Sequence, residues 1–552
     1  MKIGSGMQLI RAAFFIVLLS FLCKGLNASS LQTYNYFKDS YLSNCIKNEK
    51  NLNILASGWI PLPVEQLKHT PGFSHYQKRI FTPNYLLAQR IVAQGGHAKL
   101  VFLTTTPVSK SFRKYLFHLG SHDKSLDFQK IDRSIYEEVL IDDADLLDND
   151  FPFASPAKRL LNNTDKFNTL KQKIEDWRED PKNIILGLSM YGSESHSETL
   201  AKRLNIPYLA LNRQHAYWGT KSGSRKAFRE AGVPHPRGTY EPVYSIAELA
   251  EDISKTLKET GARKIIVKLE EGASGDGNQV LDFGELCTTN HAHASIEISD
   301  IEELLRQLPT LYLSQIPKLG AIVEELIVGE NFTSPGTIFI INGENDVQIL
   351  TAYDQVLGGK DSQVYMGGKG PRQRPRDAAD KKHADLVEFT KNIAQVLSIK
   401  GVRDHGGTDF VVCKQEYQGE LRPFAYAIEN NIRHTGTSIP YKTMLALLGE
   451  GAANKKFYQS NDHVKLPLIK SIIEKDGQDN KAISKIENTL YAWLQKQEFS
   501  YNQTTQTGAI IHFDMLQEGG LGLTAIANSS EEAQEIISKA SEDLQKFDPK
   551  QS

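Results

Sequence analysis

The sequence predicts a multidomain protein that combines α/β and α+β architecture. The chain has 552 residues, which is enough for three or four domains with sizeable cores. Strand-like and helix-like segments alternate from residue 52 to residue 211, as they do in an α/β layer with a parallel sheet. Further along the chain, apolar strand-like segments are joined by glycine-rich and proline-rich stretches.

The first layer begins with a strand in LNILASGWIPL, from Leu52. YLLAQRIVAQGGHAKLVFLTTTP, from Tyr85, predicts a helix, a Gly-Gly break and a strand. NIILGLSMYG, SHSETLAKRL and IPYLALN then predict a strand, a helix and a strand. We expect these strands to pair in parallel with helices on their faces.

Residues 245–261 predict a well-defined helix. Ser245 is the expected N-cap, Glu248 completes a capping box, and Gly261 ends the helix. The apolar residues of this segment recur at helical spacing, namely Ile246, Leu249, Ile253 and Leu257.

Further strands and helices are predicted between residue 264 and the C-terminal region. KIIVKL and VQILTAYDQVLGG predict strands, and a second amphipathic helix carries Leu386, Phe389, Ile393 and Val396. GAIIHFDML and GLGLTAIAN predict two late strands, followed by a helix capped by Ser529 and Glu532. The Pro and Gly clusters near residues 234–238 and 367–376 predict loops.

Composition indicates an ordinary globular protein. Hydrophobic residues make up 40% of the chain and charged residues 24%, with a net charge of −2. This charge gives no indication of binding to nucleic acid or to an acidic membrane surface. Cys23 lies in the N-terminal apolar run; Cys45, Cys287 and Cys413 have neither the pattern of a disulfide framework nor metal-ligand spacing, and we expect them to be small buried residues.

The N-terminus resembles a secretory signal. Lys2 and Arg11 precede an apolar run over residues 12–23, and a small-residue stretch offers a cleavage site after Ala28. The run is short for a membrane-spanning helix. We expect residues 1–28 to be a signal-like or anchor segment; a buried helix or a mis-assigned start codon are the alternatives.

The segment FAYAIENNIRHTG, residues 424–436, carries the strongest chemical pattern. Read as a strand, it places Glu429, Asn431 and Arg433 on one face, behind the small side chains of Ala425 and Ala427.

Asp409 begins another apolar run in GGTDFVV. Two carboxylates, an amide and a fixed cation suit Mg²⁺ held against phosphate oxygens. The sequence therefore predicts a metal site at Asp409, Glu429 and Asn431.

Two further segments fit a phosphate-binding role. The loop EEGASGDGN follows the strand that contains Lys268, and its glycines allow backbone N–H groups to turn toward an anion. An ordinary flexible turn is the alternative, and no Walker motif follows. Lys221 lies where GTKSGSRKAFREAGVPHP enters a helix, so it could bind a phosphate. The alternative is that the basic residues of this helix form a solvated charged face.

AIVEELIVGEN, from Ala321, is an apolar strand interrupted by acids. Its backbone fits a hinge that binds an adenine edge, with Glu330 accepting from ribose hydroxyls. Solvated acids at a strand end are the alternative. The basic loop over residues 358–376 is a candidate lid, with a mobile surface loop as its alternative. No Cys/His cluster suggests zinc, and neither a G-x-S-x-G nor an H-E-x-x-H motif is present.

Taken in order, these segments resemble the ATP-grasp superfamily, and among its members the peptide ligases of the pheganomycin-biosynthesis type. The resemblance rests on GTKSGSRKAFREAGVPHPRG, IVKLEEGASGDGN, TAYDQVLGG followed by QVYMGG, and IENNIRHTGTSIP. It extends to PGFSHYQKRI and SHSETLAKRLNIPYLAL before these motifs, and to GAIIHFDMLQEGGLGLTAIANSSEEA after them.

The resemblance implies an ATP-grasp fold preceded by a Rossmann-like pre-ATP-grasp domain. The implied domains are a pre-ATP-grasp domain over 45–215, a catalytic nucleotide-binding domain over 216–450 and a C-terminal ligase-family domain over 451–545.

The resemblance also assigns roles to single residues. Lys221 and Lys268 would contact the phosphates or the adenine region, and Ser274, Gly275 and Gly277 would cover the phosphates. Glu325 and Ile327 would offer hinge backbone to adenine, and Glu330 would bind ribose. Asp409, Glu429 and Asn431 would hold one or two Mg²⁺ ions, or Mn²⁺, and Arg433 would stabilise the transferring phosphoryl group.

The chain departs from the family pattern at several positions. Glu270 replaces a common Asn, Asp276 is a shorter acid than the usual Glu, and Ala352-Tyr353 replaces a His. The segment from Thr437 to Ile439 and the basic stretch after QVYMGG also differ. The proposed metal and phosphate residues are retained, so these changes concern substrate preference more than nucleotide chemistry.

The implied activity is ATP-dependent formation of an amide or peptide bond between a small carboxylate and an amine, with Arg433 and Lys268 as catalytic residues and amino acids or peptides as substrates. Two alternatives remain open: a phosphotransferase on the same fold and a non-catalytic nucleotide-binding protein. The signal-like N-terminus suggests export or anchoring, whereas use of ATP suggests a cytoplasmic catalytic domain.

Overall fold

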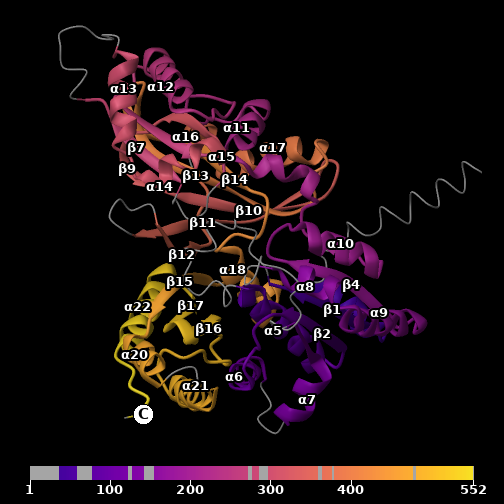
Figure 1. Ribbon diagram of the computed structural model, residues 1–552. Coiled ribbons are helices and arrows are strands. Elements are labelled where there is room, and N and C mark those ends of the chain that lie inside the picture. Colours follow the sequence, from indigo (N-terminus) through magenta and orange to yellow (C-terminus); the bar gives the residue numbers. More distant parts are fainter. Residues whose placement is uncertain are drawn as a thin grey trace, which may run out of the picture.

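The computed structural model describes residues 37–58, 77–121, 127–141, 154–271, 277–284, 296–358, 364–375, 378–476 and 480–550. The strands within these ranges form three sheets, here named A, B and C, of five, three and nine strands (Figure 1). The predicted combination of a parallel α/β layer with mixed α+β parts is confirmed.

Sheet A is parallel and has the strand order β3-β2-β1-β4-β5. Its strands are β1 Asn51–Ser57, β2 His97–Thr104, β3 Tyr136–Leu140, β4 Asn183–Met190 and β5 Tyr208–Leu209. The accompanying helices are α2 Asp39–Lys47, η2 Gln77–Ile80, α5 Phe81–Ala93, α6 Lys110–Gly120, α7 Phe128–Ile135, α8 Pro156–Asn162, α9 Thr164–Glu179 and α10 Ser195–Leu204. Ile54 faces one apolar core and Leu55 the other, so β1 is buried on both faces.

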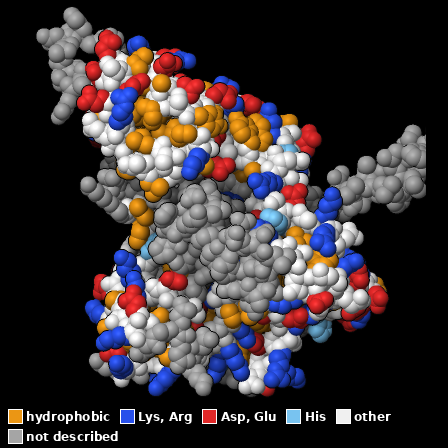
Figure 2. Space-filling model, viewed as in Figure 1, with side chains coloured by type: hydrophobic (Ala, Val, Ile, Leu, Met, Phe, Trp, Pro, Cys, Tyr) orange, Lys and Arg blue, Asp and Glu red, His pale blue; other side chains and the backbone are white. Residues whose placement is uncertain are grey.

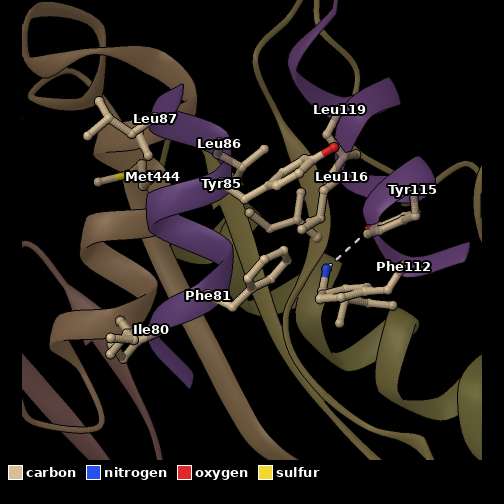
Figure 3. Close-up of a cluster of buried hydrophobic side chains, with 14 of the residues drawn as sticks. Ile80, Phe81, Tyr85, Leu86, Leu87, Phe112, Tyr115, Leu116, Leu119 and Met444 are labelled. Carbon is tan, nitrogen blue, oxygen red and sulfur yellow. Dashed lines mark hydrogen bonds between the residues drawn. The ribbon is translucent and has the colours of Figure 1, made fainter. Parts of the chain in front are cut away.

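Helix α5 joins two parts of the chain that are far apart in sequence. Figure 3 shows Phe81 and Tyr85 of α5 close to Phe112 of α6, with Met444 on the other side of α5. Met444 belongs to α18, Ser438–Leu448, which begins shortly after the predicted metal segment. The shared core therefore fixes the end of that segment against sheet A.

Sheet B is a small antiparallel sheet with the order β7-β6-β8. Its strands are β6 Lys264–Leu269, β7 Asn278–Asp282 and β8 Ala321–Glu325, and its helices are α12 Ile246–Thr260, α13 Ile298–Arg306, α14 Thr310–Leu313 and α15 Ile316–Leu319. Helix α12 begins and ends as expected: Ser245 Oγ accepts from the Glu248 N–H, and Gly261 is left-handed at φ 67°.

Sheet C has the order β14-β13-β10-β11-β12-β15-β17-β16, with β9 on β13. Its strands are β9 Glu330–Thr333, β10 Pro335–Gly343, β11 Asp346–Gly358, β12 Val364–Gly370, β13 Asp404–Tyr417, β14 Glu420–Asn431, β15 Phe457–Lys465, β16 Gly508–Met515 and β17 Gly520–Ala527. Helices α11 Lys221–Glu230, α16 Ala378–Ala384 and α17 Leu386–Ile399 cover one face of its first half. The remaining elements are η4 Arg213–Gly219, α19 Glu450–Ala453, α20 Pro467–Asp476, α21 Asn480–Leu494, η5 Leu516–Glu518 and α22 Ser530–Gln545.

The loop predicted over residues 367–376 is only partly a loop. Residues 364–370 form β12, which pairs with both β11 and β15 inside sheet C. Its glycines serve close packing, since a Cβ at Gly367 would lie 2.1 Å from the Ser460 carbonyl oxygen. The proposal of a lid over the whole of residues 358–376 is therefore wrong for the residues of β12, and residues 359–363 and 376 lie outside the described part.

Strand β12 also links the two halves of sheet C. The strands after residue 451 continue the same sheet that carries β13 and β14 (Figure 1). The proposed domain boundaries stay a prediction.

The described residues contain no helix that is both long enough and apolar enough to span a bilayer. Residues 1–28, with the predicted signal-like segment, lie outside the described ranges. On the face shown in Figure 2, acidic and basic side chains are interspersed, in line with the small net charge.

Candidate active site

The three predicted metal residues lie together on sheet C. Strands β13 and β14 pair so that Asp409 is directly opposite Glu429 and Gly407 is opposite Asn431. Asn431 Nδ2 donates to Asp409 Oδ2 at 2.7 Å. Two carboxylates and an amide from neighbouring strands thus converge, as the sequence predicts.

One part of the strand interpretation is wrong. The pairing shifts between Asp409 and Phe410 because β14 carries one more residue there, Ile428. This bulge reverses the alternation of side chains. Ala427 therefore points into the helix-covered core, and Tyr426, rather than an alanine, shares the face of Glu429.

Asp409 is held by further donors. Gln355 Nε2 of β11 donates to Asp409 Oδ1 at 2.8 Å, and the Tyr353 hydroxyl lies 3.4 Å from the same oxygen. Burial and the neighbouring charge of Glu429 raise the pKa of Asp409 to about 7, against the opposing effects of Arg433, Lys221 and Asn431. Proton and cation would compete for this carboxyl group near neutral pH.

Lys221 connects α11 to the carboxylates. Its Nζ lies 2.6 Å from Glu429 Oε2, and its side chain is 8% exposed. Thr220 caps α11 by accepting from the Gly223 N–H, which places Lys221 in the first turn of the helix.

Lys268 belongs to a buried ionic triad. Lys268 Nζ lies 2.7 Å from Glu324 Oε2, and Arg225 Nη1 lies 3.2 Å from Glu324 Oε1. Burial alone would raise the pKa of Glu324, but the charges of Lys268 and Arg225 outweigh it and the pKa is lowered. The triad carries two positive charges and one negative charge, so one positive charge is left to attract an anion.

Arg225 and Glu324 belong to the site although the sequence motifs gave them no role. The signal that could have found Glu324 is its position inside an otherwise apolar strand, where an acid is costly unless it is paired. Arg225 was hidden among the other basic residues of α11, and nothing in the sequence marks it as the buried one.

Hydrogen bonds of Glu270 connect the start of α11 to the end of β6. Its carboxylate accepts from the Ser222 N–H at 3.1 Å and from the Ser222 hydroxyl. The backbone N–H of Lys221 donates to the Glu270 carbonyl at 3.3 Å. A carboxylate at this helix N-terminus is electrostatically favourable, which gives the departure from Asn a structural role.

Part of the backbone of the expected adenine-binding hinge is already hydrogen-bonded within the protein. The Glu325 N–H donates to the Arg237 carbonyl at 2.8 Å, and the Glu325 carboxylate pairs with the Arg237 guanidinium at 2.9 Å. The Glu325 N–H is therefore used within the protein, and binding of adenine by the backbone of Glu325 and Ile327 stays a prediction. Ile327 follows the end of β8, and Glu330 is exposed on β9 opposite Lys414.

Gly277 and Arg433, also predicted site residues, form hydrogen bonds within the protein. The Gly277 carbonyl accepts from the Leu269 N–H at 2.9 Å, and Arg433 Nη1 donates to the His434 carbonyl at 3.2 Å. Ser274 and Gly275 lie outside the described residues.

A cavity of about 200 Å³ lies elsewhere, on the face of sheet C that carries Ala352 and Val412. Tyr353 and Asp409 point to the opposite face, so this cavity is separate from the site. Among the described residues, no group of three or more His, Cys, Asp or Glu side chains is placed to hold a metal ion. The set found here has two carboxylates and an amide.

One curated protein is similar in sequence to this chain. Over 335 residues the chain is 30% identical to the L-propargylglycine–L-glutamate ligase of Streptantibioticus cattleyicolor. The alignment covers 58% of this chain and 62% of the ligase, so the chain spans less than two thirds of that relative. No family model matches the chain.

Two solved structures are also similar. The biotin carboxylase of Campylobacter jejuni is 13% identical, with a TM-score of 0.49, over 90% of this chain and 95% of that chain. The L-amino acid ligase of Bacillus licheniformis is 12% identical, with a TM-score of 0.43, over 90% of this chain and 97% of that chain.

Over the aligned part, the chain is thus similar to a curated ligase, which agrees with the resemblance of its motifs to the ATP-grasp superfamily.

Proposed function

We propose that this protein is an ATP-dependent carboxylate–amine ligase that forms an amide or peptide bond through an acyl-phosphate intermediate. The observation that carries the proposal is the pairing of Asp409 opposite Glu429, with Lys221 Nζ 2.6 Å from Glu429. The similarity to a ligase whose name joins two amino acids supports this reaction class.

The donor set fits Mg²⁺. Asp409, Glu429 and Asn431 carry side-chain oxygen atoms on adjacent strands, with the Asn431 nitrogen now facing Asp409, and hard divalent cations prefer oxygen ligands. When bound, one or two Mg²⁺ ions, or Mn²⁺, would neutralise charge on the phosphate oxygens. Glu429 would bridge two ions if both bind.

The proposed reaction has two steps. A substrate carboxylate oxygen attacks the γ-phosphorus of ATP, the bond to the β-phosphate oxygen breaks, and ADP leaves. The nitrogen of an amine then attacks the acyl carbon, phosphate leaves, and the nitrogen loses a proton. The protein supplies no nucleophile, because catalysis rests on positioning and charge stabilisation.

The residues divide these tasks. Lys268 and Lys221 hold the phosphate chain, and Arg433 stabilises the charge on the transferring phosphoryl group and on the tetrahedral intermediate. Gly277, Ser274 and Gly275 would cover the phosphates, Glu325 and Ile327 would offer backbone to adenine, and Glu330 would accept from the ribose.

The expected substrates are amino acids or short peptides. The site must exclude water, because an acyl phosphate hydrolyses. A cytoplasmic catalytic domain would have ATP available, whereas residues 1–28 favour export or anchoring, so the location of the mature enzyme is part of the proposal to be tested.

Release of ADP tests the proposal directly. The full chain is incubated with ATP, Mg²⁺ and pooled amino acids and peptides, and products are analysed by mass spectrometry. We expect ADP, phosphate and an amide product in equal amounts, and none of these from Glu429→Ala. A phosphorylated acceptor without amide would indicate a phosphotransferase, and nucleotide binding without ADP release would indicate a non-catalytic protein.

A further inference from the structure

In the proposed reaction Lys221 binds the phosphate chain and Glu429 binds the metal ion, yet the two side chains contact each other. We propose that Lys221 is the counter-ion of Glu429 until nucleotide arrives, and that the site therefore takes up a divalent ion only together with the nucleotide. This inference rests on the proposed function and adds a rule for the order of binding.

The geometry carries the first step. A distance of 2.6 Å between Lys221 Nζ and Glu429 Oε2 is a short charge-assisted hydrogen bond. An ammonium group this close to Oε2 would crowd and electrostatically repel a divalent ion that bound the same carboxylate. We therefore infer that Lys221 moves away from Glu429 when this carboxylate binds a metal.

Burial restricts where Lys221 can go. Its side chain is 8% exposed, so the ammonium group cannot simply turn into bulk water. Glu324, the other carboxylate in the buried set, is already shared by Lys268 and Arg225. A phosphate chain would provide a new anionic partner at the moment Glu429 is released.

The local charge points the same way. Among the described residues, the ion pairs of Lys221, Lys268 and Arg225 involve two carboxylates, Glu324 and Glu429, so three positive charges meet two negative ones in these pairs. A divalent ion alone would increase this excess, whereas a triphosphate reverses it.

The other proposed ligands are also engaged. Asp409 Oδ1 accepts from Gln355 and Asp409 Oδ2 accepts from Asn431, so the Asn431 amide group faces a carboxylate. Asn431 must rotate to turn its oxygen toward a metal. This rearrangement, like the release of Lys221, is a cost that a metal ion without nucleotide would have to offset alone.

The test measures Mn²⁺ binding to the full chain by electron paramagnetic resonance, with and without a non-hydrolysable ATP analogue. Without nucleotide we expect Lys221→Met to bind Mn²⁺ at least tenfold more tightly than the wild type. Lys226→Met is the matched control, because Lys226 lies on the same helix as Lys221 but pairs with Glu241 and not with Glu429; its affinity should stay within twofold of the wild type. Lys221→Gln serves as a second variant if the methionine variant does not fold.

Adding the analogue provides the second readout. In the wild type it should tighten Mn²⁺ binding at least tenfold, and in Lys221→Met this gain should shrink, because coupling between two ligands is reciprocal. Unchanged or weaker nucleotide-free binding in folded Lys221→Met would overturn the inference, as would Mn²⁺ binding that persists in Glu429→Gln. Because no turnover is measured, failure here is distinct from a lack of ligase activity.

Discussion

Replacing Asp409 by Asn should stabilise the protein above neutral pH, although it removes a proposed metal ligand. In the folded protein, burial and the charge of Glu429 raise the pKa of Asp409 from its ordinary value of 3.8 to about 7. A folded-state pKa above the unfolded one means that an ionised Asp409 destabilises the fold. This penalty grows as pH rises from about 4 to about 7 and is constant at higher pH.

The size of the effect follows from the same values. A pKa raised from 3.8 to about 7 corresponds to on the order of 4 kcal/mol at pH 8, at about 1.4 kcal/mol for each pH unit. This is an upper limit, because the Asp409 side chain is only partly buried and solvent screens its charge. We therefore expect a gain of about 1–2 kcal/mol at pH 8 and almost none at pH 4.

The assay is the thermal unfolding midpoint of Asp409→Asn and wild type, followed by circular dichroism from pH 4 to pH 8. A gain of this size raises the midpoint by a few degrees, at about 2–4 °C per kcal/mol.

Asp404→Asn is the control, for which we expect a loss of stability rather than a gain at pH 8. Burial works against its ionisation, but His405 and Lys442 outweigh this and lower the pKa of Asp404, so its charge stabilises the fold above pH 4. Loss of stability in Asp409→Asn at pH 8, without a pH-dependent gain, would refute the reasoning.

Four further predictions can be checked independently. Glu429→Ala, and the more conservative Glu429→Gln, should abolish ADP release with an unchanged circular dichroism spectrum; near-normal turnover would reject the metal assignment. Excess EDTA should stop turnover and Mg²⁺ or Mn²⁺ should restore it, whereas activity in EDTA would argue against a divalent ion. Glu270→Ala should lower the unfolding midpoint by an amount equivalent to about 1 kcal/mol, as loss of a helix cap does, and Glu270→Gln should retain part of that stability. N-terminal sequencing of the natural protein should find a mature end after Ala28, and an intact Met1 would show that this signal is not cleaved.

Much of the secondary structure follows from local patterns. Strand β1, helix α12 and strand β6 are where the sequence predicts them, because alternating burial, helix caps and a terminal glycine act over only a few residues. The face assignment of β14 failed at Ile428, because a bulge depends on the partner strand and leaves no mark in an alternating sequence.

The site shows the same division. That Asp409, Glu429 and Asn431 lie close together was predictable, since acids and amides stand out in apolar strands. Lys268 was predicted near phosphate, but its pairing with Glu324 and the burial of Arg225 were not. The contact between Lys221 and Glu429 was not predicted either. These residues are 208 positions apart in the chain and meet through the packing of α11.

The sequence by itself determined which residue types could hold a phosphate chain and a divalent ion, and in which elements they lie. The tertiary structure alone decided which charges neutralise each other, that β12 is an interior strand, and that the last strands extend sheet C. The physical reason is that periodicity records how deeply each position is buried, whereas the choice of partner depends on packing between distant segments.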